Sequence, residues 1–477
     1  MKKNFIYNLI YQLLVLILPL ITVPYVSRIL GADGIGTFSY TYSIAYYFMI
    51  IAMLGINNYG NRTIAKVRDN KKELSKEFQG IYFLQLIMSI IMVILYFGYI
   101  VIFHNKYKII AIIQSMYILS SAFDVNWFFF GIEKFKLTIT RNTIIKLLSL
   151  ILIFIFVKSS NDLCKYTAIL AGSTLLSNII LCTFLRKYVK FEKISKKDVL
   201  KHFKPCITLF LPVIAVSIYK IMDKIMLGFM SSVADVGYYE NAEKIINVPL
   251  TVITALGTVM LPRVSNMLSN NKEEQVKNII AKTMPFILFL SLPMVLGLIA
   301  VSKDFSVIFF GDKFIKSGVL IQLLSITIMF LSWGNVIRTQ YLIPKERDRE
   351  YIISALLGAI INFIMNMIFI PKYESIGACI GTISAEFVVM FYQSWKVKNE
   401  LPLKDYIKDS IQFLIKSIIM FIIILMVGKI VKQNSLLKLI LQIFVGVLVY
   451  VLLNIRYILN YVKLDNILKK FRKESMI

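Results

Sequence analysis

The chain of 477 residues is 58% hydrophobic and 17% charged, whereas soluble proteins average roughly 45–50% and about 25%. With a mean hydropathy of +0.72, these values exclude an ordinary soluble protein and indicate a polytopic α-helical membrane protein. The 54 Lys and Arg residues against 27 Asp and Glu give a net charge of +27, which would suggest nucleic acid in a soluble protein but also fits loops that obey the positive-inside rule.

Cysteine and histidine usage excludes several kinds of site. The four cysteines are scattered over the apolar runs without a Cys-x-x-Cys pair, which argues against a zinc site, a redox dithiol and a disulfide scaffold. His104 and His202 lie outside these runs and have no partner at metal-ligand spacing, so we expect both to be solvated. We therefore expect no metal site and no cofactor.

The apolar runs predict fourteen membrane spans, measured against the roughly 20 residues that a membrane helix needs. The first follows Met1-Lys2-Lys3 and continues to Leu30 without a small-residue cleavage site, so it is expected to be a membrane helix and not a signal peptide. The approximate limits of the spans are 8–30, 37–59, 80–103, 108–130, 141–158, 163–185, 205–230, 238–262, 282–302, 317–343, 351–371, 373–396, 411–431 and 435–455.

Basic residues orient this predicted bundle. Loops on the side of the N-terminus hold 37 of the 54 cations, the opposite loops hold 11, and six lie within the spans. Because cytoplasmic loops carry the excess of Lys and Arg, both termini are predicted to be cytoplasmic. The loops of the opposite side are short, so no extramembrane catalytic domain and no catalytic residue are expected.

Prolines and glycines mark several spans. Pro19 and Pro24 interrupt the first span, and Pro205 and Pro212 fall at the start of the seventh. Since freed backbone carbonyls are tolerated where they line a cavity, we favour bending helices around a central cavity over ordinary proline enrichment. Gly377-x-x-x-Gly381 is expected to be a surface for close helix packing.

The aromatic run Trp127-Phe128-Phe129-Phe130 ends the fourth span on the predicted cytoplasmic side. Trp and Tyr are enriched at membrane interfaces. We therefore expect this run to belong to an interfacial aromatic belt.

Cations within the spans are candidates for binding an anionic substrate group, because an ionisable group deep in a bilayer usually faces the protein interior or water. Lys220, Asp223 and Lys224 share one face of the seventh helix, which indicates either a cationic cavity wall or a structural ion pair. Arg28, near the outer end of the first span, and Arg338, near the inner boundary of the tenth, complete the candidate set.

Acidic residues within or beside the spans are candidates for coupling to a proton or sodium ion, because their charged form is disfavoured there. The sequence does not choose among them. They are Asp124, Asp223, Glu240, Glu243 and Glu386.

The two halves of the chain resemble each other at a constant offset of 201 residues. The matched pairs are Gly36 and Gly237, Phe38 and Tyr239, Arg62 and Arg263, Asn70 and Asn271, Lys71 and Lys272, and Glu73 and Glu274. Six spans fit each repeat, so the lobes are predicted to be related by a pseudo-two-fold axis along the membrane normal. The predicted parts are residues 1–200, 201–400 and, for two additional C-terminal helices with a basic tail, 401–477, and Arg62 and Arg263 mark equivalent cytoplasmic loops.

Several motifs resemble a known family. The stretch from Asp124 to Phe135, with Trp127, Gly131 and Glu133, resembles the aspartate–tryptophan–glycine–glutamate signature of bacterial polysaccharide repeat-unit flippases. Similar family stretches are Pro24-x-x-Ser27-Arg28-x-Leu30-Gly31, Asp223-Lys224-x-x-Leu227-Gly228, Val236-Gly237-Tyr238-Tyr239, Ala242-Glu243-Lys244, Leu261-Pro262-Arg263, Asn366-x-x-x-Ile370-Pro371-Lys372-Tyr373 and Ile376-Gly377-Ala378. Their order and spacing are similar to those of the polysaccharide branch of the multidrug/oligosaccharidyl-lipid/polysaccharide exporter superfamily.

The resemblance implies a fourteen-helix flippase whose two six-helix lobes enclose a central cavity. Its expected substrate is an undecaprenyl-pyrophosphate-linked oligosaccharide, carried from the inner to the outer leaflet of the bacterial cytoplasmic membrane by alternating access and driven by a proton or sodium gradient. Expected partners are membrane lipids, a polysaccharide polymerase and glycosyltransferases, and no nucleic acid.

Three alternatives remain open on the sequence. A multidrug antiporter and a peptidoglycan lipid-precursor flippase share the superfamily fold, although fourteen spans and excess lysine argue against the antiporter. A membrane glycan polymerase is an enzyme of a different class. Such enzymes tend to carry a long external loop, and no predicted external loop exceeds about fourteen residues.

Overall fold

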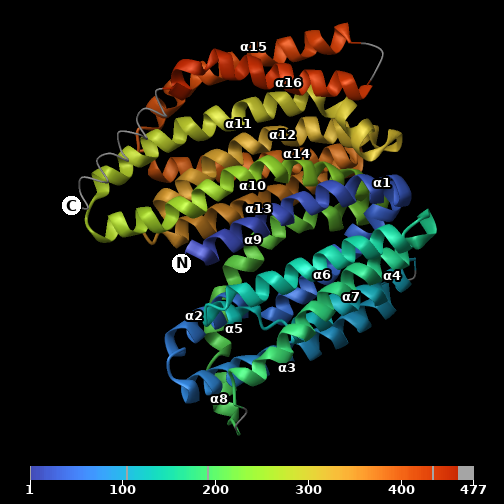
Figure 1. Ribbon diagram of the computed structural model, residues 1–477, viewed down its shortest axis with the longest axis vertical. Coiled ribbons are helices and arrows are strands. Elements are labelled where there is room, and N and C mark those ends of the chain that lie inside the picture. Colours follow the sequence, from blue (N-terminus) through green and yellow to red (C-terminus); the bar gives the residue numbers. More distant parts are fainter. Residues whose placement is uncertain (1, 104–105, 191–192, 432–434, 460–477) are drawn as a thin grey trace. The chain divides into compact units, whose positions relative to one another are not determined.

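A computed structural model describes residues 2–103, 106–190, 193–431 and 435–459. For residues 2–17, 212, 215 and 219 within these ranges, it describes the backbone and not the side chain. These residues form sixteen α-helices and no strand (Figure 1), which confirms the predicted all-α class. The helices are α1 (Lys2–Met53), α2 (Ile56–Val67), α3 (Lys71–Phe103), α4 (Lys108–Ala122), α5 (Asn126–Gly131), α6 (Phe135–Phe156), α7 (Leu163–Thr183), α8 (Lys196–Leu200), α9 (Phe203–Met230), α10 (Val233–Ser269), α11 (Glu273–Phe310), α12 (Ile315–Ile337), α13 (Asp348–Tyr373), α14 (Ser375–Val397), α15 (Leu403–Ile430) and α16 (Ser435–Leu453).

Twelve helical segments of the described residues are long and apolar enough to cross a membrane. One of them, Leu18–Val67, contains the second half of α1 together with α2. The backbone of α1 leaves the helical region at Gly31 (φ 67°, ψ −177°), so the predicted spans 8–30 and 37–59 lie on either side of a break that glycine tolerates. The count of fourteen spans and the symmetry of the lobes stay predictions.

The chain divides into two compact units. Unit 1 contains residues 1–241 and 359–381, and unit 2 contains residues 242–358 and 382–477. The predicted lobe boundaries near residues 200 and 400 stay predictions.

Unit 1 has a large aromatic core where α2, α3 and α5 meet. Trp127, Phe128 and Phe129 are almost fully buried in it, and only Phe130 reaches the surface. The expectation of an interfacial belt is therefore wrong for the first three residues. Their helix α5 is only six residues long and turns inward after α4, so its side chains pack against Phe78 of α3.

Gln85 of α3 fixes the chain between α4 and α5. Its amide nitrogen donates to the carbonyl oxygens of Ser121 and Asp124 at 2.5 and 2.9 Å, and its oxygen accepts from Trp127 Nε1 at 2.9 Å. Buried backbone carbonyls and indole N–H groups need partners. One side chain supplies both here, and it thereby positions Asp124.

The repeat-related glycines meet where α1 crosses the start of α10, within unit 1. A Cβ on Gly36 would lie 1.6 Å from the Val233 carbonyl oxygen, and a Cβ on Gly237 would lie 2.1 Å from the Ala32 carbonyl oxygen. Each contact maps onto the other at the offset of 201 residues. Only glycine permits two helix backbones to approach this closely.

A glycine pair also joins the part of α13 and α14 that belongs to unit 1. A Cβ on Gly377 would lie 2.3 Å from the Phe369 carbonyl oxygen, and one on Gly381 would lie 2.1 Å from Asn366 Oδ1. The predicted close-packing role of this small-residue motif is confirmed.

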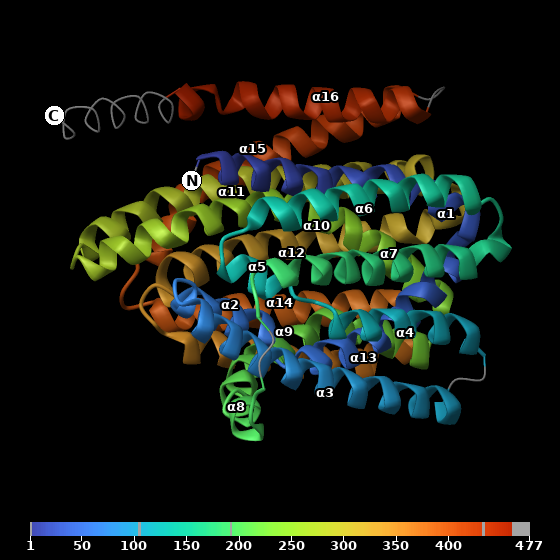
Figure 2. The ribbon, with the colours of Figure 1, turned by 60° about the horizontal axis from the view of Figure 1, so that its bottom comes forward.

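In unit 2, α15 and α16 lie side by side next to α11 (Figures 1 and 2). Tyr450 of α16 donates to the Phe289 carbonyl oxygen of α11 at 2.8 Å, and Gln442 donates to the Ile424 carbonyl oxygen at 3.1 Å. Lys416, one of the six cations within predicted spans, donates to Asn454 Oδ1 at 3.1 Å. These polar bonds join apolar helices and give Lys416 a structural partner.

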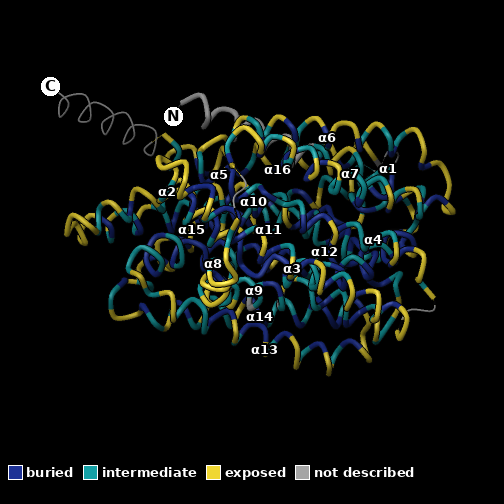
Figure 3. Tube along the Cα trace, turned by 90° about the horizontal axis from the view of Figure 1, so that it is seen from below, coloured by how far each residue is buried: buried dark blue, intermediate teal, exposed yellow. Residues whose placement is uncertain are grey.

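His202 is fully buried, which corrects the expectation that it is solvated. It precedes α9, and the exposed helix α8 (Figure 3) leads into it. Its Nδ1 lies 2.8 Å from the Tyr59 hydroxyl, and its Nε2 lies 3.6 Å from Glu77 Oε2. Charged neighbours in the sequence predicted a solvated histidine. The prediction is wrong because α2 and α3 pack against the side chain and exclude water. His104 lies outside the described residues.

We expect His202 to make stability depend on pH. Burial disfavours the imidazolium and lowers the pKa of His202 below its ordinary value, despite the nearby Glu77 carboxylate. As the pH falls below about 6.5, the unfolded chain takes up this proton before the folded chain does, so stability is lost. Thermal unfolding of purified protein from pH 7.5 to 5 measures the effect, and His202→Gln should reduce the slope. An equal slope in both proteins would contradict this account.

Candidate functional site

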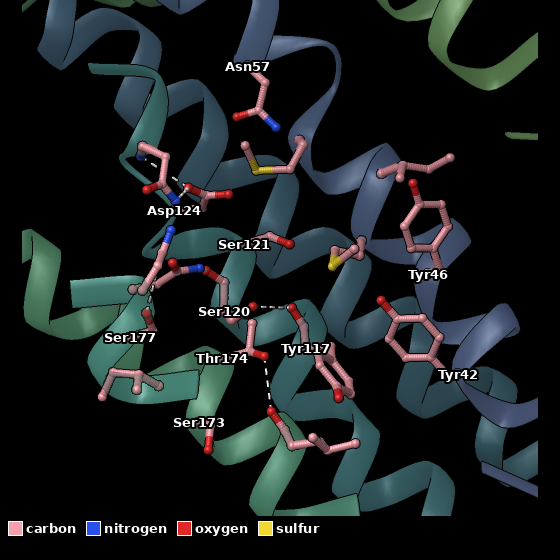
Figure 4. A pocket seen from close by; sticks show the side chains of 18 of the residues that line it. Tyr42, Tyr46, Asn57, Tyr117, Ser120, Ser121, Asp124, Ser173, Thr174 and Ser177 are labelled. Atoms are coloured by element: carbon pink, nitrogen blue, oxygen red, sulfur yellow. Dashed lines mark hydrogen bonds between the residues drawn. The ribbon is translucent and has the colours of Figure 1, made fainter. Parts of the chain in front are cut away.

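A cavity of about 700 Å³ lies within unit 1 (Figure 4). This volume is in the range of roughly 300–1,000 Å³ that ligand sites occupy. The helices α1, α4, α6 and α7 supply most of its wall. The lining residues are Tyr42, Tyr46, Met49, Ile50, Met53, Gly55, Asn57, Asn58, Tyr117, Ser120, Ser121, Asp124, Asn126, Asn142, Ile145, Lys146, Ser149, Leu170, Ser173, Thr174, Ser177, Asn178 and Val213.

Asp124 is the carboxylate of this wall. It stands between the end of α4 and the start of α5, where Gln85 holds the backbone. Its Oδ1 accepts from the backbone nitrogen and the side-chain amide of Asn126 at 3.1 and 2.6 Å. The sequence predicted Asp124 as an ion-coupling candidate, and the structure places it at a polar cavity. Its coupling role stays a prediction.

Arg141 of α6 lies behind the wall and was not among the predicted site residues. It is buried, its NH1 donates to the Ser177 carbonyl oxygen at 2.8 Å, and its NH2 donates to Asn126 Oδ1 at 3.0 Å and to Asn142 Oδ1 at 2.6 Å. Two lining amides are thereby held by one guanidinium, whose planar fork suits several acceptors.

Lys146 of α6 lines the cavity and was also missed. Arg141 and Lys146 lie at the start of the fifth predicted span, where the sequence counts them as cytoplasmic loop charges. In the structure, α6 begins at Phe135, before this span, so both cations belong to a helix. The available signal in the sequence is the short length of the predicted span 141–158, which leaves room for the helix to begin earlier.

Hydroxyl groups of α4, α6 and α7 line the cavity. Ser120, Ser149 and Thr174 each donate to a carbonyl oxygen of their own helix, at 2.7, 2.8 and 3.0 Å. Ser177 Oγ lies 3.4 Å from Asn142 Oδ1. A hydroxyl has one hydrogen to donate and two lone pairs, so these groups present acceptors to the cavity.

Three tyrosines form the aromatic side of the cavity (Figure 4). The ring centroids of Tyr42 and Tyr117 are 4.9 Å apart in an edge-to-face contact, and those of Tyr42 and Tyr46 are 6.1 Å apart. Tyrosine combines an apolar ring with a polar tip. The cavity therefore offers aromatic surface opposite its hydroxyls and amides.

A second polar cluster in unit 1 joins α9 to the start of α10. Lys224 Nζ lies 2.7 Å from Glu240 Oε2, which also accepts from Ser39 Oγ at 2.8 Å. Ser39 and Glu240 are 201 residues apart, the offset of the repeat. Both charged side chains are about 85% buried (14% and 16% exposed), so the ion pair is part of the core.

Asp223 belongs to the same cluster and is also buried. It accepts from the Tyr239 hydroxyl at 2.8 Å and from Asn366 Nδ2 at 2.6 Å. These bonds tie α9 to α10 and α13. The predicted pairing of Asp223 with the lysines of its own helix stays a prediction.

The other predicted site residues are distributed over both units. In unit 1, Arg28 of α1 and Lys220 of α9 have exposed side chains. In unit 2, Arg338 donates to Asn335 Oδ1 at 2.9 Å and lies 5.5 Å from the Tyr351 ring centroid, Glu243 is half-buried and Glu386 is buried. The repeat-related Arg62 of α2 and Arg263 of α10 are exposed. Their functional roles stay predictions.

Residues 1–268 match the family described as "Polysaccharide biosynthesis protein". The chain belongs to this family. The matched part contains every lining residue of the unit 1 cavity and the Lys224–Glu240 ion pair. The polysaccharide branch that the sequence motifs resemble is thereby confirmed.

Curated relatives agree with this family over most of the chain. A protein of Shigella dysenteriae named "Putative O-antigen transporter" is 24% identical over 402 residues, which cover 83% of this chain and 100% of the relative. A protein of the same name from Escherichia coli K12 is 23% identical, with 84% and 97% covered. "Probable low-salt glycan biosynthesis flippase Agl15" of Haloferax volcanii is 25% identical over half of each chain.

Solved structures show the fold that this family member shares. The inward closed conformation of the lipid II flippase MurJ aligns with a TM-score of 0.78 at 18% identity and covers 96% of this chain and 100% of that chain. An inward-facing multidrug resistance transporter of the MATE family aligns with a TM-score of 0.59 at 14% identity, with 82% and 99% covered. The family member is thus a multi-pass membrane protein with the fold of these transporters.

Proposed function

We propose that this chain is a flippase for a lipid-linked oligosaccharide in surface polysaccharide biosynthesis. The observation that carries the proposal is a cavity lined by hydroxyls, amides and tyrosines inside the membrane-spanning helices of a polysaccharide biosynthesis family member. Polar groups are costly within a bilayer unless they face protein or a water-filled cavity, and a hydrophilic substrate explains why this wall is polar. The names of the curated relatives support the same class.

The substrate we propose is an undecaprenyl-pyrophosphate-linked repeat unit. It moves from the inner to the outer leaflet of the bacterial cytoplasmic membrane, and both termini of the flippase face the cytoplasm. The excess of basic residues in the loops on the N-terminal side supports this orientation. The lipid tail stays in the bilayer while the sugars cross through the protein, and polymerase and glycosyltransferases act on the two sides.

Alternating access provides the movement in this proposal, and a proton or sodium gradient resets it. Carboxylates within the membrane support coupling, because their charge state depends on their surroundings. The candidates are Asp124, Asp223, Glu240, Glu243 and Glu386, with Arg28, Lys220, Lys224 and Arg338 as candidates for the pyrophosphate charge.

Deletion of the gene in its own bacterium tests the function. We expect surface polysaccharide to be lost and one undecaprenyl-linked repeat unit to accumulate in the cytoplasmic leaflet, because flipping precedes polymerisation. Mass spectrometry of extracted lipids, with and without a glycosidase added outside intact spheroplasts, measures amount and leaflet. Lethality with accumulation of the peptidoglycan precursor would instead identify a peptidoglycan lipid-precursor flippase, and externally exposed, unpolymerised units would identify a polymerase.

A further inference from the structure

We infer that the cavity of unit 1 is a subsite for one sugar residue of the transported oligosaccharide, and that the pyrophosphate binds elsewhere. This inference rests on the proposed function and assigns a chemical class to its cavity. Three properties of the wall carry it: the hydrogen-bonding state of the hydroxyls, the distribution of charge, and the aromatic surface.

The hydroxyls of the wall are arranged to accept hydrogen bonds. Ser120, Ser149 and Thr174 use their only hydrogen on carbonyl oxygens of their own helices. Asn178 likewise directs its amide to the Ser120 carbonyl oxygen at 3.1 Å. The lone pairs left over bind a ligand that donates. Sugar hydroxyls donate, whereas an ionised pyrophosphate only accepts.

The charges of the wall disfavour a dianion and a cation alike. Asp124 contributes a carboxylate to the wall, which repels phosphate in a region of low dielectric. Arg141 directs NH1 and NH2 to Ser177, Asn126 and Asn142, so these groups hold the wall together. Lys146 is the cation of the described lining. Within the lining itself, one lysine and one carboxylate leave no net charge for a pyrophosphate or a cation, which favours a neutral, polar ligand.

The aromatic side matches the remaining surface of a pyranose. Tyr42, Tyr46 and Tyr117 present apolar rings with polar tips, and a sugar ring has an apolar C–H face and a polar edge. Figure 4 shows these rings on one side and Ser173, Thr174 and Ser177 on the other. A pyranose ring placed between the two sides would contact both kinds of surface.

The cavity is also open where a cytoplasmic substrate is expected to enter. Asn57 and Asn58, which follow the turn at Gly55 into α2, are exposed. They precede the loop around residues 60–79, which is predicted to be cytoplasmic. In Figure 4, Asn57 lies at the opposite end of the cavity from Ser173.

Binding of N-acetylglucosamine to the full chain in lipid nanodiscs tests the inference, with saturation-transfer NMR and no ion gradient. We expect binding by the wild type, weakened several-fold by Thr174→Val, which keeps the shape but removes an acceptor. Asp124→Asn should weaken it about tenfold, since it removes a charge-assisted bond. Thr183→Val is the matched control, because Thr183 is exposed on the same helix and donates to the Ile180 carbonyl oxygen in the same way. It should bind like the wild type.

Several results would overturn the subsite. They are no saccharide signal from the wild type, equal binding by Thr174→Val and Thr183→Val, and displacement of the saccharide by sodium pyrophosphate with tighter pyrophosphate binding in Asp124→Asn. The lipid analysis of the deletion strain is independent of these measurements. If the lipid-linked unit accumulates while the binding results fail, the flippase stands and its sugar subsite lies elsewhere. If it does not accumulate, the proposed function itself fails.

Discussion

Gly36→Ala is expected to prevent most of the protein from folding. The new methyl group would lie 1.6 Å from the Val233 carbonyl oxygen, a backbone atom that cannot move aside without separating α1 from α10. Overpacking of flexible side chains costs about 1–3 kcal/mol, and a clash with backbone exceeds this range. The same crossing aligns Ser39 with Glu240, so its loss also disturbs the ion pair beside it.

Thermal unfolding and size-exclusion profiles of the purified protein measure this effect. Gly237→Ala should act in the same direction, because its methyl group meets the Ala32 carbonyl oxygen at 2.1 Å. Gly98→Ala on α3 is the matched control, since a Cβ there has nothing within 4 Å. Alanine has the higher helix propensity, so this control should be neutral or slightly stabilising. If Gly36→Ala unfolds at the temperature of Gly98→Ala, the two helices are not in backbone contact.

The fold class and the repeat were accessible from the sequence because they depend on patterns along the chain. Apolar runs of about 20 residues predict membrane helices directly, and a constant offset identifies equivalent positions. The offset also points to contacts: Gly36 meets the Gly237 region, and Ser39 bonds to Glu240. These residues meet because α1 crosses the repeat-related start of α10. The offset shows which positions are equivalent, but it does not specify where the helices cross.

The candidate site was only partly accessible, because its members come from segments far apart in the chain. Asp124 stood out as an acidic residue in an apolar run, but nothing near it in sequence indicates that Gln85 holds its backbone. Arg141 looked like a loop cation until its helix proved to begin at Phe135. Trp127 was misassigned to the interface because a hydropathy pattern does not reveal that α5 turns inward. A hydropathy pattern indicates which segments lie in the membrane. Whether a side chain in such a segment faces lipid or the protein core depends on tertiary contacts that the pattern does not contain.

The partner of Lys224 was likewise beyond the sequence, and it provides a test that separates structure from transport. Lys224→Met should reduce stability by about 3 kcal/mol, because it leaves the Glu240 carboxylate buried without its cation. The double variant Lys224→Met/Glu240→Gln should recover most of this loss, since a neutral amide can still accept from Ser39. Lys220 is itself exposed on α9, so Lys220→Met should leave the free energy of unfolding within about 0.5 kcal/mol of the wild type.

Polysaccharide export is then measured in the deletion strain that carries each variant at matched protein levels. This measurement shows whether the Lys224 cation contributes to transport. If Lys224 contributes charge for the pyrophosphate, the double variant folds but still exports poorly, because removal of Glu240 restores the fold and not the positive charge. Lys220→Met should then reduce export without reducing stability. Should the double variant recover export together with stability, and Lys220→Met export normally, Lys224 is a structural partner of Glu240 and the cationic wall is wrong. Thermal unfolding and export respond to different properties of the Lys224 side chain. Comparing both measurements in these three variants therefore decides between a structural role and a role in binding pyrophosphate.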